Sequence, residues 1–254
     1  MQLHVLRRSF TALAAAAAAS ACVPGMGRLA AREGLTEERA LDPDGFFSLE
    51  NVNGRVTVST WNEPRVRIEA EKSAISESRL RQLRVEIEGQ GHEVSVRTRL
   101  PGSWLFGGSG MVEYRITVPS GARVRLTTVN GSVDVRDVTG ELRASTVNGS
   151  LEVADVSGNV DATTVNGRIR ARYRSINTNG RNRFSTTNGS IDISVPEGAG
   201  GTFEARTVNG RVHCDVPLES TRRSDRHYLE GRLGKGTGSF ELSTINGSIR
   251  LERS

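Results

Sequence analysis

Cysteine, lysine and aromatic side chains are scarce in this chain of 254 residues. The two cysteines, Cys22 and Cys214, lie far apart, so the disulfide framework typical of small secreted domains is not expected. The only lysines are Lys72 and Lys235, so arginine carries almost all the positive charge and the formal net charge is +5. With 5% aromatic residues and 28 glycines, the composition predicts short strands and turns around a thin aliphatic core.

A long apolar run occurs only at the start of the chain. Arg7 and Arg8 precede an apolar stretch too short to span a bilayer stably, which predicts a signal peptide over residues 1–21 and hence export. The following Cys22 completes the sequence ASAC, which resembles a bacterial lipobox. Lipidation of Cys22 would hold the protein at a membrane surface, in the periplasm or on the outer surface. Simple cleavage is the alternative, and residues 22–44 are expected to form a polar tether.

One short sequence returns along the chain. TTVNGSVDV at 127–135 becomes STVNGSLEV at 145–153 and TTVNGRIRA at 163–171, a spacing of 18 residues. Apolar residues stand three and five places after each asparagine, and this alternation predicts a half-buried strand. The asparagine of the repeat, preceded by an early copy at Asn53, occurs at Asn130, Asn148, Asn166, Asn188, Asn209 and Asn246.

An Asn-Gly pair usually indicates a two-residue β-hairpin, but the flanking residues argue against it here. In a hairpin, Val129 would lie on the polar face, as would its counterparts Val147, Val165 and Val208. At the corner of a solenoid these valines can point inward, the glycine takes a positive φ, and the asparagines stack about 4.8 Å apart in a hydrogen-bonded ladder. We therefore predict an all-β, two-sheet β-solenoid (β-helix-like) with about 18 residues per coil. A sandwich of hairpins is the alternative.

The chain after the tether is expected to form a single domain over residues 45–254. Its first part, 45–118, is irregular, and a short helix is expected near residues 76–84. The regular coils occupy 119–254.

Three features resemble the bacterial "putative adhesin" domain family, a group of exported or membrane-attached proteins of unknown function. They are VPSGARVRL leading into TTVNGSVDV, the serial Asn-Gly strands, and the terminal GRLGKGTGSFELSTINGSIRL. The resemblance covers roughly residues 45–254. It implies a β-solenoid with a surface role and supplies no catalytic residue.

Insertions lengthen the later coils at one place in the repeat, and two of them carry arginine beside aromatic residues. We expect these loops to emerge along one edge, which in repeat proteins is often the binding side. Such an edge suits an envelope glycan, a lipid head group or an acidic protein surface, and solvated loop charge is the alternative. The candidate residues are Arg172, Tyr173, Arg174, Arg222, Arg223, Arg226 and Tyr228.

Catalytic and metal-binding patterns are not found in the sequence. Asp137 and Asp155 recur in two coils only, beside a turn, so a role in the turn is the simpler account. We expect no enzyme activity, no cofactor and no metal site, and export argues against a nucleic-acid partner. The sequence thus favours a non-catalytic, lipid-anchored envelope scaffold or adhesin-like protein. A carbohydrate-active β-helix enzyme and a stress-sensing or regulatory lipoprotein are the alternatives.

Overall fold

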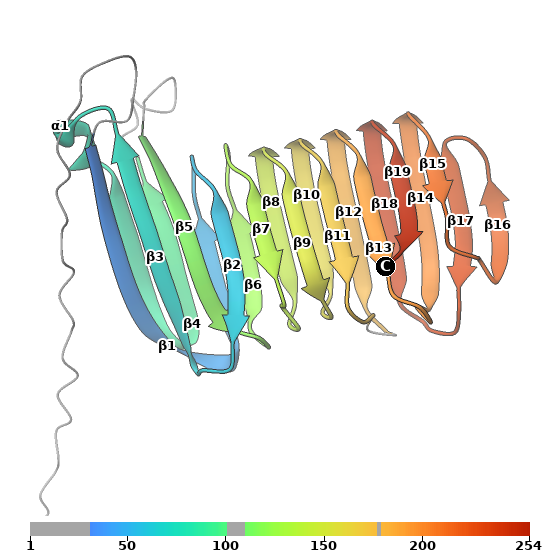
Figure 1. Ribbon diagram of the computed structural model, residues 1–254, viewed down its shortest axis with the longest axis horizontal. Coiled ribbons are helices and arrows are strands. Elements are labelled where there is room, and N and C mark those ends of the chain that lie inside the picture. Colours follow the sequence, from blue (N-terminus) through green and yellow to red (C-terminus); the bar gives the residue numbers. More distant parts are fainter. Residues whose placement is uncertain (1–30, 101–109, 177–178) are drawn as a thin grey trace, which may run out of the picture.

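The computed structural model describes residues 31–100, 110–176 and 179–254. These residues contain nineteen strands and one short helix, and the strands are mostly parallel, so the predicted all-β class is confirmed (Figure 1). In the N-terminal part the elements are β1 (Ala31–Glu50), β2 (Val56–Trp61), β3 (Arg65–Ala74), α1 (Glu77–Leu80), β4 (Arg84–Arg99) and β5 (Gly110–Pro119).

The repeated part of the chain alternates between two runs of paired strands. Its strands are β6 (Arg123–Thr127), β7 (Val133–Arg136), β8 (Leu142–Asn148), β9 (Leu151–Val156), β10 (Val160–Asn166), β11 (Ile169–Tyr173), β12 (Arg181–Asn188) and β13 (Ile191–Val195). The last part contains β14 (Gly201–Asn209), β15 (Val212–Cys214), β16 (Ser220–Ser224), β17 (Tyr228–Leu233), β18 (Ser239–Asn246) and β19 (Ile249–Arg253).

The strands form two long faces. Face A runs in the order β1, β3, β5, β2, β7, β9, β11, β13, β19, β15. Face B runs in the order β4, β1, β6, β8, β10, β12, β18, β14, β17, β16. The long strand β1 contributes its first half to face A and its second half to face B.

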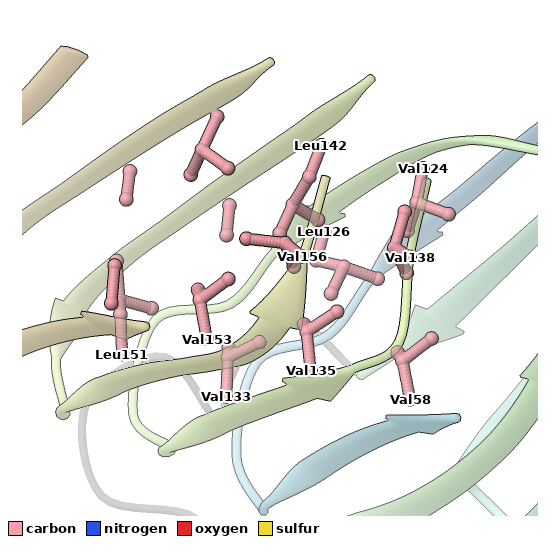
Figure 2. Packing of buried hydrophobic residues seen from close by; sticks show 14 of the residues in the cluster. Val58, Val124, Leu126, Val133, Val135, Val138, Leu142, Leu151, Val153 and Val156 are labelled. Carbon is pink, nitrogen blue, oxygen red and sulfur yellow. The ribbon is translucent and has the colours of Figure 1, made fainter. Parts of the chain in front are cut away.

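The core lies between the two faces and is aliphatic. Because side chains alternate along a strand, every second residue of each repeat strand points inward. Val133 and Val135 of β7 stack on Leu151 and Val153 of β9, which they face in the strand register (Figure 2). Val124, Leu126 and Leu142 of face B belong to the same buried cluster. Burial of these residues from water stabilises the body, since each such side chain contributes roughly 1.5–3 kcal/mol.

The coils do not stack in sequence order at the C-terminal end. The last two strands, β18 and β19, lie between the β12–β13 pair and the β14–β15 pair. The chain therefore passes one coil position by, forms β14 and β15, and returns to fill the position it left. Between these steps β17 pairs antiparallel with β14, and β16 pairs with β17, which extends face B (Figure 1).

The structure corrects the predicted start of the domain. Residues 31–44, assigned above to a polar tether, belong to β1. This strand pairs antiparallel with β3, with Ala31 opposite Ala74 and Ala40 opposite Arg65. The first half of this strand is not recognisable in the sequence, because it is rich in charged residues and lacks the usual alternation of apolar and polar residues. Its side chains form ion pairs with those of the partner strand β3. The pairs include Arg32 with Glu71 at 3.0 Å and Lys72 with Glu33 at 2.8 Å.

The predicted short helix is confirmed as α1. Ser76 caps its N-terminus, where the Ser76 Oγ accepts a hydrogen bond from the Arg79 backbone N–H at 3.3 Å. Leu80 is buried, so this one turn contacts the body through a single apolar side chain.

Candidate functional site

The Asn-Gly corners form one continuous ladder of side-chain amides along the edge of the body. From the second asparagine onward, each Nδ2 donates to the Oδ1 of the asparagine in the preceding coil of the stack at 2.7–2.8 Å. The Nδ2 of the first, Asn53, donates to the Gly110 carbonyl at 3.1 Å. The order follows the spatial stack rather than the sequence: Asn53, Asn130, Asn148, Asn166, Asn188, Asn246, Asn209. The amides are exposed, and their bonding along the ladder fixes the register of the coils.

The corner glycines are required for close approach, which corrects the expected reason for their presence. A Cβ at Gly149 would lie 2.0 Å from the carbonyl oxygen of Gly131, and a Cβ at Gly167 would lie 2.0 Å from that of Gly149. Among the corner glycines, only Gly54 has a positive φ. The bend itself therefore does not demand glycine in the later coils, and the neighbouring coil's backbone does.

Threonine, and not valine, points inward at the corner. Val129 is 39% exposed and Val208 is 63% exposed, so the prediction that these valines face the core is wrong. The preceding threonines are buried: Thr128, Thr146, Thr164, Thr186, Thr207 and Thr244. Strand alternation continues up to the asparagine, so the side chain two places before it points inward and the side chain next to it points out.

The buried threonine hydroxyls bond to the backbone of the neighbouring coil. Thr146 Oγ1 donates to the Gly131 carbonyl at 3.1 Å, and Thr164 Oγ1 donates to the Gly149 carbonyl at 3.0 Å. Thr128 differs, because its hydroxyl has no partner in the described part of the chain. The corresponding carbonyl, that of Gly54, accepts instead from Asn51 Nδ2 at 3.2 Å.

The first predicted loop is held by contacts within the protein. Arg172 forms a two-pronged ion pair with Asp155 at 2.8 and 3.2 Å, and Arg174 pairs with Asp137. The Arg172 guanidinium holds the pKa of the Asp155 carboxyl below its usual range, mainly through this hydrogen bond. Asp137 and Asp155 have φ values of 62° and 58°, which fits a role in the turn.

Tyr173, predicted at the same edge, belongs to the core. Its hydroxyl donates to Asn182 Oδ1 at 2.7 Å, and its ring packs edge-on against Phe240 with centroids 5.5 Å apart. Burial raises the pKa of this phenol well above its usual value. Tyr173 is thus closed to a ligand at the surface.

The second predicted loop forms the β16–β17 hairpin. Arg222 pairs with Glu230 at 3.0 Å, and Arg223 pairs with Asp225 at 3.1 Å while lying 4.9 Å from the ring centroid of Tyr228. Arg226 is exposed and forms no ion pair with any residue the structure describes.

The two loops lie at opposite edges, so the single edge expected for them is not formed. The tip of the β16–β17 hairpin meets the Asn-Gly corner, where Thr207 N donates to His227 O at 2.9 Å and Val212 N to Arg226 O at 3.0 Å. Arg174 directly follows β11, at the end of that strand away from the corner, where its backbone N–H donates to Val156 O at 2.9 Å. The reason is the hairpin itself, which carries the inserted residues back across face B.

The cysteines occupy unrelated places. Cys22 and the predicted signal peptide lie outside the described residues. Cys214 is half-buried, and burial raises the pKa of its thiol. Within residues 31–100, 110–176 and 179–254, no group of three or more His, Cys, Asp or Glu side chains could hold a metal ion.

A surface hollow of about 540 Å³ lies on face A near the C-terminal end. Four arginines line it: Arg168, Arg170, Arg211 and Arg250. Arg170 and Arg250 stand on β11 and β19, and Arg168 and Arg211 come directly before β11 and β15. All four lie outside the insertions in which the sequence suggested a site. A run of arginine at alternate positions after Asn-Gly was visible in the sequence, but the strand order that gathers these side chains was not.

No curated protein matches the chain. A solved putative cell adhesion protein from Clostridium sporogenes is 12% identical, covers 87% of this chain and 100% of its own, and has a TM-score of 0.46. A putative adhesin from Bacteroides fragilis is 11% identical, covers 86% and 97%, and has a TM-score of 0.31. A putative lipid binding protein from Parabacteroides distasonis is 9% identical, covers 87% and 96%, and has a TM-score of 0.26.

A protein-family model matches almost the whole described body. It covers residues 47–252, from the second half of β1 to the last strand β19, and therefore includes every copy of the Asn-Gly corner. The chain belongs to the DUF4097 toastrack family.

Proposed function

We propose that the protein is a non-catalytic, adhesin-like or scaffold protein of the cell envelope. The observation that carries this proposal is that the repeated polar side chains form hydrogen bonds and ion pairs within the protein. The asparagines and threonines of the corner bond from coil to coil, and Arg172 bonds to a turn aspartate. The repeat thus builds a two-sheet β-solenoid, with about 18 residues per coil in its regular part, whose long faces suit contact with a partner.

A lipid on Cys22 would hold this body at a membrane surface. The sequence around Cys22 supports the proposal. In the described part of the chain, no helix has the length and apolar character needed to cross a bilayer. An acyl anchor with several chains would be sufficient for stable attachment.

Mass spectrometry of the mature N-terminus tests the anchor. We expect a diacylated or triacylated Cys22 as the first residue, and we expect Cys22→Ala to move the protein from the membrane fraction to the soluble fraction. Cys214→Ala serves as the matched control and should remain in the membrane fraction. An unmodified thiol at residue 22, or cleavage elsewhere, would refute the anchor.

Binding to envelope material tests the scaffold function. The purified protein should be retained on isolated envelope fractions and not on cytoplasmic extract, through a glycan, a lipid head group or a protein. Arg226→Glu at the tip of the β16–β17 hairpin tests whether this tip takes part. Release of reducing sugars from envelope polysaccharide by the protein would instead favour a carbohydrate-active enzyme.

A further inference from the structure

The hollow on face A is built from two cross-strand rows of side chains. In one row Arg170, Asp192, Arg250 and His213 stand on β11, β13, β19 and β15, each beside the next in the strand register. The other row lies two residues earlier, directly before the same four strands, and two serines stand there between two arginines. Its members are Arg168, Ser190, Ser248 and Arg211. Figure 1 shows these four strands side by side.

Positive charge in the hollow exceeds what the protein neutralises. Asp192 pairs with Arg168 at 3.7 Å, and the other lining carboxylate, Glu252, accepts a hydrogen bond from Ser194 at 2.9 Å. Arg170, Arg211 and Arg250 have no ion-pair partner within the described residues. Since arginine keeps its charge at every accessible pH, three guanidinium groups are available to an anion.

The spacing of the rows indicates which anion fits. Arg168 is already engaged, since its Nε donates to Ser190 Oγ at 3.0 Å. Neighbouring strands lie about 4.8 Å apart, so the unpaired Arg170 and Arg250, two strands apart, are separated by about 10 Å along the sheet. That distance is longer than one phosphate group spans. The serine hydroxyls of the other row supply further donors, which suits a tetrahedral phosphate with its several acceptor oxygens better than a planar carboxylate.

We propose that this hollow binds a compound bearing two or more phosphate groups, with Arg211 and Arg250 as its principal contacts. Arg211 stands beside Ser248 on the neighbouring coil, and Arg250 follows Ser248 by two residues, so both arginines border the same serine in the hollow. A volume of about 540 Å³ lies within the range of ligand sites in proteins. The inference rests on the proposed function as an envelope-binding protein, because it names the ligand chemistry that this hollow would bind there.

Isothermal titration calorimetry of the purified full chain with tripolyphosphate tests the site directly. We expect saturable binding that weakens as salt rises, and an affinity at least tenfold lower in the double variant Arg211→Glu/Arg250→Glu. The control is Arg84→Glu/Arg181→Glu, which changes the net charge equally at two exposed arginines away from the hollow. Circular dichroism and the melting temperature check that each variant folds.

A second arm distinguishes a lipid head group from a soluble phosphate compound. In a Cys22→Ala background, which removes any acyl chain, the protein is sedimented with vesicles of cardiolipin, whose head group bears two phosphates, in phosphatidylcholine and with phosphatidylcholine alone. Binding to the anionic vesicles that the Arg211/Arg250 variant loses supports a lipid source, and tripolyphosphate binding without vesicle binding supports a soluble one. No binding to either probe, or equal loss in both double variants, overturns the site. Neither result depends on export, so the anchor proposal stands or falls separately.

Discussion

At the corner, single threonine hydroxyls provide a measurable contact between coils. Thr164 is buried and donates to the Gly149 carbonyl, whereas Thr128 is equally buried without a partner in the described chain. Thr164→Val should lower the free energy of unfolding by about 1 kcal/mol, because it leaves a carbonyl unpaired. Thr128→Val should leave stability unchanged or raise it. Urea unfolding of the two variants measures the difference, and equal losses would show that the hydroxyl bond is not the cause.

The Arg172–Asp155 pair gives a pH dependence whose sign follows from the pKa of the aspartate. Because Arg172 lowers that pKa in the folded state, the pair stabilises the protein above the unfolded pKa, and this contribution is lost as pH falls through the folded value. Arg172→Gln should therefore be less stable than the wild type at pH 7, and the difference should shrink at acid pH, as Asp155 becomes protonated in the folded state. Arg181→Gln, at an exposed arginine without an ion pair among the described residues, should differ little from the wild type at either pH. Chemical unfolding at both pH values would refute the assignment if the difference for Arg172→Gln stayed constant.

At the scale of a single coil, the spacing to the next coil depends on glycine. A Cβ at Gly149 would collide with the Gly131 carbonyl, and this backbone atom cannot move without parting the coils. Gly149→Ala should lower the free energy of unfolding by about 3 kcal/mol, as overpacking of a close contact does. The matched control is Gly34→Ala in β1, where nothing lies within 4 Å of the new atom and the backbone is compatible; it should gain about 0.5 kcal/mol. Thermal melts that shift equally for both would show that the collision is relieved elsewhere.

The sequence predicts which strand residues of a coil are buried, but it predicts the side-chain directions at the corner only in part. Alternation from Val133 to Val135 and from Leu151 to Val153 identifies the buried side chains of the core. The error at Val129 came from the assumption that an apolar residue beside a bend must point inward. Thr128 shows why that assumption fails: a β-branched polar residue fits the inward position when the neighbouring coil offers a carbonyl, and local hydrophobicity does not carry that information.

At the scale of the whole molecule, strand pairing between distant segments determines which strands are neighbours, and the periodicity of the sequence does not predict this order. The charged strand β1 looked like a tether because its partner, β3, is supplied by a distant segment with complementary charge. In the same way, Arg250 stands between Asp192 and His213 in the hollow only because β19 lies between β13 and β15. A repeat read in sequence order would instead place β15 directly beside β13.

The position of the C-terminal strands β18 and β19 predicts which segment depends on them for its stability. Among the described strands, β14 and β15 pair with the preceding coils only through β18 and β19, so removal of residues 239–254 should leave the segment 201–238 without its main neighbour. In hydrogen exchange followed by mass spectrometry, we expect that segment to lose its protection in the truncated variant, because its backbone bonds to β18 and β19 are gone. The coils from β6 to β11 do not touch β18 or β19 as paired strands and should keep theirs. If 201–238 stayed protected, the β14–β17 segment would have to pair directly with β12 and β13, and the order of coils at this end would be set by sequence proximity instead.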